Sequence, residues 1–290
     1  MKILLFGGGG QLGSEIIKRG YDLNFEVISP VTSELDIADR FQVMYLANQV
    51  KPDLVINAAA YTAVDQAEEE IQRAYATNRD GAHNIALAAE QCQARLIQIS
   101  TDYVFDDTHS EPIKEDAKPS PLSVYGASKY AGERAVQAIL GDAALVVRTS
   151  SLHGKRGQNF VHTMIRLLSE RDLVQVVNDQ IMSPTWAGWL AEVLLDLGRI
   201  PAQGVLHACG AGAVSWYDFA CEIRQLVAEQ LKTRRVAKIE PIPARDYKSP
   251  ARRPIYSVMD TGRLTGLLGR EPISWRDGLK AHLTELGYKL

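Results

Sequence analysis

The sequence contains little of what marks several large classes of protein. Its three cysteines, Cys92, Cys209 and Cys221, are odd in number and lack metal-ligand spacing, which indicates reduced thiols rather than a disulfide framework or a metal site. No apolar run approaches the length of a membrane span, and the N-terminus lacks a signal-peptide pattern. A net charge of −3 argues against nucleic acid as the main partner. We therefore expect a cytoplasmic protein with no membrane attachment and no metal.

Repeats and low-complexity tracts are also absent, and the composition is that of an ordinary globular chain. Of the 290 residues, 46% are apolar and 23% are charged, which is enough for one large core or two joined cores. Short apolar runs alternate with helical stretches, and this alternation predicts an α/β fold with a doubly wound parallel sheet of the Rossmann type. The predicted strands are 2–6, 25–30, 53–57, 95–100 and 144–148, and the predicted helices between them are 40–50, 68–90 and 125–140.

The composition of the sequence changes after about residue 150, where polar, glycine-bearing and proline-rich loops become frequent. We predict a dinucleotide-binding Rossmann domain over 1–150. The remainder, 151–290, is predicted to be mainly a smaller C-terminal substrate-binding lobe, interleaved with the last Rossmann elements. The elements expected in it are helices near 160–170, 186–198 and 216–232 and a strand at 174–177.

A glycine-rich turn separates the first predicted strand from the first helix. Gly7, Gly10 and Gly13 satisfy one dinucleotide-binding spacing, and Gly8, Gly10 and Gly13 satisfy another. Either register gives a tight turn, close approach of a pyrophosphate to bare backbone, and an anion at the helix N-terminus. A glycine turn that follows a strand and opens a helix predicts a dinucleotide site.

Tyr125 and Lys129 are four residues apart in a predicted helix, so they share one face of it. A nearby ammonium favours the phenolate, and we expect it to lower the pKa of Tyr125 toward the range useful for proton transfer. The same spacing also arises where an aromatic ring simply packs on a lysine stem. The glycine turn and the strand order favour the catalytic interpretation.

Taken together, the motifs resemble the dTDP-4-dehydrorhamnose reductase family of the extended short-chain dehydrogenase/reductases. The resemblance covers almost the whole chain. It rests on Gly10-Gln11-Leu12-Gly13, Asn57-Ala58-Ala59-Ala60-Tyr61-Thr62, Ser100-Thr101-Asp102-Tyr103-Val104-Phe105, Val124-Tyr125-Gly126, Asn178-Asp179-Gln180 and Pro184-Thr185.

The resemblance implies that NADPH or NADH reduces the C4 ketone of a dTDP-linked 4-keto-6-deoxy sugar. In this reading Tyr125 gives a proton to the nascent alkoxide, Lys129 holds the nicotinamide ribose, and Thr101 donates a hydrogen bond to the same oxygen. The expected cofactor-binding residues are Gly7, Gly10, Gln11, Leu12, Gly13, Asp36, Ile37, Ala58, Ala59, Ala60, Thr62, Tyr125 and Lys129. The expected substrate-binding residues are Thr101, Asp102, Tyr103, Ser151 and Arg253.

Two features leave the cofactor and the sugar open. The segment Ser29-Pro30-Val31-Thr32, at the tip of the second predicted strand, offers neither an acid for a ribose hydroxyl nor an arginine for a 2′-phosphate. Ser151 stands where relatives commonly have an aromatic residue, which removes a wall from the expected sugar pocket.

Other activities of the superfamily stay as alternatives. Sugar-nucleotide dehydratases carry an acidic residue where this chain has Tyr103, so elimination is disfavoured. An epimerase and a non-catalytic, NADP-binding regulatory subunit of this fold are the competing hypotheses. A homodimer is compatible with the resemblance, although the acidic ligands that join subunits through a metal in some relatives cannot be placed in this sequence.

Overall fold

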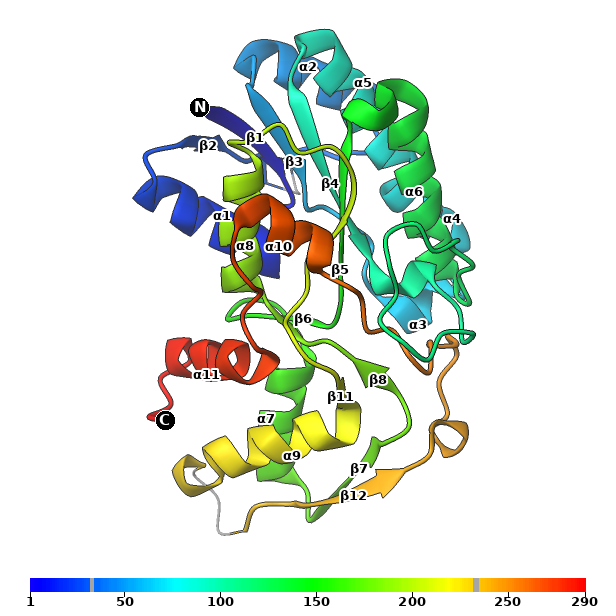
Figure 1. The fold of residues 1–290 in the computed structure, drawn as a ribbon, viewed down its shortest axis with the longest axis vertical. Coiled ribbons are helices and arrows are strands. Elements are labelled where there is room, and N and C mark those ends of the chain that lie inside the picture. The colour runs from blue at the N-terminus through cyan, green and yellow to red at the C-terminus, as the bar shows by residue number, and fades with distance from the viewer. Residues whose placement is uncertain (32–33, 232–234) are drawn as a thin grey trace.

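The computed structural model describes residues 1–31, 34–231 and 235–290, so Thr32 and the predicted helix end at Lys232 lie outside the described residues. Its centre is a six-stranded sheet in the order β2-β1-β3-β4-β5-β10, in which every pairing is parallel (Figure 1). This confirms the predicted doubly wound sheet. The strands are β1 (Lys2–Phe6), β2 (Glu26–Ile28), β3 (Leu54–Asn57), β4 (Arg95–Thr101), β5 (Leu145–Thr149) and β10 (Gly204–His207).

Helices cover both faces of this sheet because its strands alternate two sets of buried apolar side chains. Ile3 and Leu5 of β1 face one layer, and Leu4 and Phe6 face the other. The first layer holds α1 (Gln11–Asp22), α8 (Ala187–Leu197) and α10 (Gly262–Leu268). The second holds α2 (Arg40–Val50), α5 (Ala82–Cys92) and α6 (Val124–Leu140).

The helix predicted over 68–90 is present as a continuous helical run from Ile71 to Cys92, but it contains a π-helical turn that was not predicted. The run consists of α4 (Ile71–Tyr75), the π-helical turn at Ala76–Gly81 and α5, and the short helix α3 (Val64–Ala67) precedes it. The wide turn carries Asn78, whose amide accepts from the backbone N–H of Tyr61 at 2.8 Å and donates to Ser128 Oγ at 2.9 Å. Gly132 of α6 lies against the Asn78 carbonyl, where a Cβ atom would collide. The π-helical turn therefore packs closely against α6.

The second half of the chain builds a smaller lobe below the sheet in Figure 1, with its own apolar core. β7 pairs with β12 in parallel, and Phe219 and Trp275 are buried between the helices. The lobe contains α7 (Phe160–Glu170), β7 (Leu173–Val177), α9 (Trp216–Val227), β12 (Lys238–Ile242) and α11 (Trp275–Glu285), with the short strands β6 (Leu152–His153), β8 (Ile181–Met182), β9 (Thr185–Trp186) and β11 (Val214–Ser215). The domain boundary near residue 150 stays a prediction.

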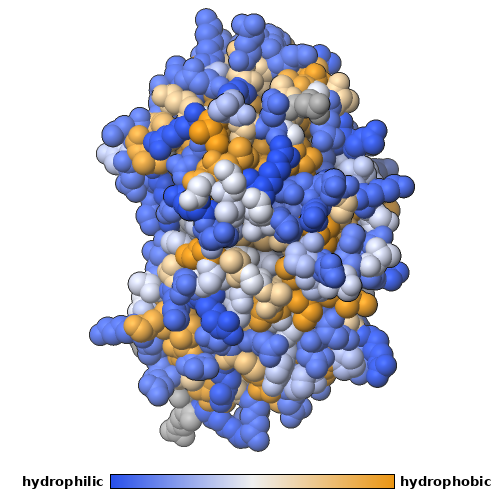
Figure 2. Space-filling view, in the orientation of Figure 1, coloured by the Kyte–Doolittle hydropathy of each residue, from blue (hydrophilic) through white to orange (hydrophobic). Residues whose placement is uncertain are grey.

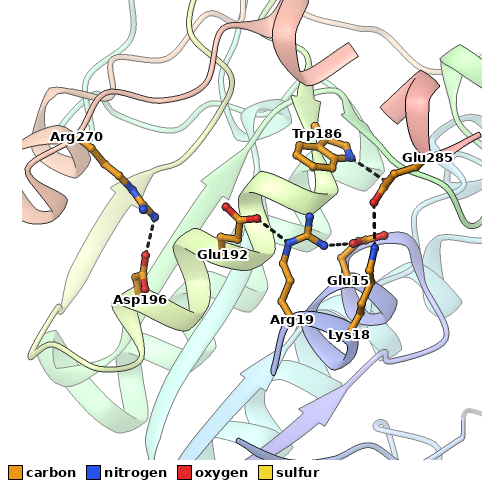
Figure 3. A network of polar contacts seen from close by, with 8 residues as sticks. All are labelled: Glu15, Lys18, Arg19, Trp186, Glu192, Asp196, Arg270 and Glu285. Atoms are coloured by element: carbon orange, nitrogen blue, oxygen red, sulfur yellow. Dashed lines mark hydrogen bonds and ion pairs between the residues drawn. The ribbon is translucent and has the colours of Figure 1, made fainter. Parts of the chain in front are cut away.

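Polar contacts tie the lobe to the sheet layer. In Figure 3, Arg19 of α1 lies between Glu15 on its own helix and Glu192 of α8, and its guanidinium stands 5.1 Å from the Trp186 ring centre. Glu285 of α11 accepts from Trp186 Nε1 at 3.3 Å. One network therefore joins three helices that are distant in sequence.

The face of the molecule seen in Figure 2 is mostly hydrophilic, with apolar residues in separate patches. Within the described ranges, no helix is both long and apolar enough to cross a bilayer.

Candidate active site

Three cavities lie in series beside the carboxyl ends of the central strands. The first, of about 550 Å³, is lined by Gly7 and Asp36. The second, of about 470 Å³, shares Gly10, Ala58 and Ala60 with the first and contains Tyr125. The third, of about 410 Å³, lies against the lobe and shares Tyr103 and Trp216 with the second. The strand order switches sides at β1, with β2 on one side of it and β3 on the other, and open α/β sheets bind ligands at such a switch point.

The glycine turn is built for close backbone contact. Gly7 adopts φ +87°, and a Cβ atom there would stand 2.5 Å from the Ala59 backbone nitrogen. A Cβ atom on Gly13 would collide with the Gly7 carbonyl, so α1 could not approach the strand. Gly10 is the N-cap of α1 and has no side-chain cap, which leaves the first N–H groups of the helix available to an anion.

Across the turn, Asn57 shapes the Ala58-Ala59-Ala60 segment. Its side chain donates to Gln98 Oε1 at 2.8 Å and accepts from the Ala59 backbone N–H at 3.1 Å. The alanines therefore present small side chains to the first two cavities. Bare backbone on one wall and an uncapped helix on the other fit the diphosphate of a dinucleotide.

The far end of the first cavity contains Asp36, Ile37 and Arg73. The Asp36 carboxylate accepts from the Ala38 backbone N–H at 2.9 Å, so it holds its own loop. Arg73 pairs with Glu70 at 3.0 Å and was not among the predicted residues. Its sequence signal was weak, because it is a single exposed arginine in a helix.

Thr101, Tyr125 and Lys129 meet in the second cavity. Thr101 and Tyr125 line the same wall of this cavity, and the Lys129 Nζ atom donates to the Ile99 carbonyl at 2.6 Å. Burial lowers the pKa of Lys129 to about 8, while Glu133 acts in the opposite direction.

The pKa of Tyr125 differs from the expectation. Burial raises it to about 12, only partly offset by the hydrogen bond with Thr101. The predicted lowering by Lys129 was wrong for the protein alone, because desolvation of the phenolate outweighs other influences. The phenol of Tyr125 therefore stays protonated over the whole physiological range.

Glu133 raises the pKa of Lys129 and is itself paired with Arg148. Neither residue was among the predicted site residues. They form a bidentate ion pair with distances of 2.9 and 2.7 Å, and their residues are 1% and 3% exposed. Glu133 continues the stripe of Tyr125 and Lys129 along α6 at four-residue spacing, which was a usable signal. Nothing in the sequence joined it to Arg148 of β5.

Asp102, Tyr103 and Ser151, predicted to bind substrate, all line the second cavity. The Asp102 carboxylate is turned inward and accepts from Ser150 Oγ at 2.8 Å. Tyr103 packs edge-on against Tyr125, with ring centres 5.7 Å apart. Ser151 adopts φ +45°, a backbone conformation that a large aromatic residue would occupy only with strain.

Arg253 lines the third cavity with its guanidinium paired to Asp65 at 2.9 Å. It also donates to Ser249, so its position is fixed by partners within the chain. Thr62, Gln11 and Leu12 line the second cavity as predicted cofactor residues. The role of each of these residues stays a prediction.

Short-chain dehydrogenase/reductases are the class in which a glycine turn of this kind faces a tyrosine and a lysine across one cavity. This chain has the fold and the arrangement of that class.

Comparison with known proteins gives the family. The chain belongs to the family described as RmlD substrate binding domain, whose sequence model matches residues 1–288. A dTDP-4-dehydrorhamnose reductase of Aggregatibacter actinomycetemcomitans is 39% identical over 286 residues, which are 96% of this chain and 97% of that protein. The predicted resemblance is confirmed.

Solved structures agree with this membership. A dTDP-4-dehydrorhamnose reductase of Clostridium acetobutylicum matches with a TM-score of 0.92 and 40% identity, covering 99% of this chain and 100% of the other. The reductase of Bacillus anthracis, solved in complex with NADP, matches with a TM-score of 0.91 and 36% identity over 98% and 99% of the two chains.

Proposed function

We propose that this protein reduces the C4 ketone of dTDP-4-dehydro-L-rhamnose to give dTDP-L-rhamnose, with NADPH or NADH as the reductant. The observation that carries the proposal is the meeting of Thr101, Tyr125 and Lys129 in a cavity continuous with the glycine turn. The printed activities of the similar proteins support the same reaction.

The reduced nicotinamide would supply the hydride. Around it, the N-terminus of α1 holds the diphosphate, and the small side chains of Ala58 and Ala60 leave room for the dinucleotide between the first two cavities. The Lys129 ammonium lies beside the cavity, where it orients ribose hydroxyls.

Tyr125 moves the proton. Its pKa of about 12 keeps the phenol protonated, and that proton passes to the C4 oxygen as negative charge develops there. Thr101 donates a hydrogen bond to the same oxygen and stabilises the charge. The ammonium of Lys129 then favours the phenolate that remains.

The nucleotide half of the substrate would occupy the third cavity. Tyr103 and Trp216 stand between the second and third cavities, which suits a sugar held beside Tyr125 and a dTDP group extending into the lobe. Arg253 provides positive charge at this end, where a diphosphate needs it.

We also propose that the enzyme works in the cytoplasm as a homodimer. The thiols of Cys92, Cys209 and Cys221 are free, which suits a reducing compartment. Sedimentation equilibrium at micromolar concentration tests the dimer.

The decisive experiment mixes the purified protein with NADPH or NADH and dTDP-4-dehydro-L-rhamnose. We expect stoichiometric loss of the reduced nicotinamide absorbance and formation of dTDP-L-rhamnose. An epimerase would interconvert dTDP sugars without net consumption of the reductant. A regulatory subunit would bind NADPH without turnover and change the kinetics of a co-purifying enzyme, and either result would overturn the proposal.

A further inference from the structure

The loop that leads into the lobe contacts the glycine turn through one pair of side-chain amides. Asn159 is the N-cap of α7, and its Nδ2 atom donates to Gln11 Oε1 at 2.9 Å and to the Gly154 carbonyl at 2.8 Å. Gln11 is the first residue of α1 and lines the second cavity. Because an amide has one accepting end and one donating end, this contact decides which end of Gln11 is used and which end stays available.

Backbone groups fix the orientation of the Asn159 amide. Its Oδ1 atom accepts from the His162 backbone N–H at 3.1 Å, and the Gly154 carbonyl can only accept, so Nδ2 must lie on the side of Gly154 and Gln11. His162 Nδ1 lies 3.5 Å from Nδ2, but it carries a proton of its own because it donates to the Gly157 carbonyl at 2.9 Å. Both protons of Asn159 Nδ2 are therefore available to Gly154 and Gln11.

The orientation of the Gln11 amide follows from that of Asn159. A donating nitrogen requires an acceptor opposite it, so Gln11 turns Oε1 toward Asn159 and keeps both protons of Nε2. Among the residues that the structure describes, none accepts from Gln11 Nε2. A Cβ atom on Gly157 would stand 3.1 Å from Gln11 Cγ, so the same loop packs against the stem of this side chain. The NH2 group of Gln11 is thus held as an unused donor at the wall of the second cavity.

We propose that Asn159 is a positioning residue that fixes the side chain of Gln11 as a hydrogen-bond donor to the diphosphate of the bound dinucleotide. The inference rests on the dinucleotide site of the proposed function. Gln11 directly follows Gly10, the N-cap of α1 whose side chain offers no cap, so its amide adds a donor to the anion-binding end of that helix. Hydrogen bonds to an anion are the stronger ones, and a donor that is already oriented loses little conformational entropy when the ligand binds.

Gln11→Met and Asn159→Ser test the two residues separately. Gln11→Met removes the donor and keeps the length of the side chain, so NADPH affinity should fall about tenfold or more, as for the loss of one hydrogen bond to a charged group. Asn159→Ser keeps a good N-cap for α7, but its side chain is too short to donate to Gln11. The ligand must then order the freed amide, and the affinity should fall about three- to tenfold. Calorimetric titration with NADPH, without any sugar, measures both.

A double-mutant cycle separates positioning from packing. If Asn159 acts through Gln11, Asn159→Ser should change NADPH affinity less than about twofold in the Gln11→Met background. If Asn159 only supports the loop or α7, its loss should weaken binding equally in both backgrounds, which would overturn the proposal. Ser274→Ala removes the N-cap of α11 in the same lobe and is the matched control, because its NADPH affinity should equal that of the wild type.

Asn159→Asp is expected to reverse the Gln11 amide. Its carboxylate still caps α7 but can only accept, so it draws Gln11 Nε2 toward itself and turns Oε1 toward the diphosphate. NADPH affinity should therefore fall further than in Asn159→Ser. The added charge also repels the diphosphate, and Asn159→Asp in the Gln11→Met background measures that repulsion alone. The loss should be at least about tenfold larger when Gln11 is present, and equal losses would contradict the proposal.

ADP-ribose identifies the part of the dinucleotide that Gln11 contacts, because it contains the diphosphate and lacks the nicotinamide. Gln11→Met should weaken the binding of ADP-ribose and of NADPH by the same factor, and an effect on NADPH alone would overturn the assignment to the diphosphate. These titrations contain no sugar, so they test the inference whatever the enzyme reduces. Coupling between Gln11 and Asn159 in a protein that turns over no keto sugar would support the inference and overturn the proposed function alone.

Discussion

At the scale of single residues, burial affects the pKa of Tyr125 more than the neighbouring Lys129 does. The four-residue spacing of Tyr125 and Lys129 was readable, and the structure brings both into one cavity. The sign of the Tyr125 pKa shift was not readable, because desolvation depends on the elements that close over the helix. The left-handed backbone of Ser151 was equally invisible in the sequence.

Tyr125→Phe tests the proton donor. The change removes one hydroxyl and keeps the ring that packs edge-on against Tyr103, so cofactor affinity should stay nearly intact. We expect kcat to fall by roughly 10²–10⁴, the range of general acid–base groups. Tyr130→Phe, a neighbour on α6, is the matched control, and steady-state kinetics with fluorescence titration of NADPH measures both. A kcat within a few-fold of wild type would remove Tyr125 from the mechanism.

Lys129→Met tests how strongly the buried ammonium of Lys129 destabilises the folded protein. The folded pKa of about 8 lies below the usual 10.5, so the unfolded chain binds more protons between these values and the stability of the wild type rises with pH across that window. The variant lacks this rise. We expect the free energy of unfolding of Lys129→Met, taken relative to that of the wild type, to fall by roughly 3 kcal/mol from about pH 7 to about pH 10.5. Urea unfolding at both pH values measures it, and parallel curves would refute the buried charge.

At the scale of elements, apolar patterning predicted strands and helices well where each element packs as a regular unit. The strand at Lys2–Phe6 and the helix at Arg40–Val50 have the predicted bounds. Across 68–90 the pattern predicted the helix, which runs from Ile71 to Cys92, but not its π-helical turn at Ala76–Gly81, because that turn packs against Gly132, far along the chain. The pair of Glu133 and Arg148 was missed for the same reason, since its partners come from α6 and β5.

The glycine turn gives a prediction at this scale. Gly10→Val places a branched side chain at the N-terminus of α1, on a wall shared by two cavities, and next to the Gly7 carbonyl 3.3 Å away. NADPH binding should weaken by at least about tenfold while the protein stays folded. Gly9→Ala is the matched control, because no atom lies within 4 Å of its added Cβ. Equal nucleotide affinity in folded Gly10→Val would place the dinucleotide elsewhere.

At the scale of the whole molecule, the site forms where the lobe packs against the sheet. Tyr103 comes from the sheet edge and Trp216 from the lobe, and both line the second and third cavities. No local pattern in the sequence could have brought them together, because their contact depends on how the two cores are joined. The network of Figure 3 is one such joint, linking α1 to α8 and α11.

Arg19→Met tests that joint. The side chains of Arg19 and Glu15 are 12% and 7% exposed, so removal of the arginine leaves a buried carboxylate without its partner and the Glu192 contact broken. We expect a loss of roughly 3–5 kcal/mol in the free energy of unfolding, partly recovered in Glu15→Gln/Arg19→Met, where no buried charge remains. Lys18→Met, whose side chain is 60% exposed, is the control and should cost less than about 1 kcal/mol. Trp216 belongs to the lobe that this network ties to the sheet layer, so we expect KM for the keto sugar to rise in Arg19→Met before NADPH affinity changes. Equal stability of the Arg19 and Lys18 variants in urea would show that packing alone holds the two cores together.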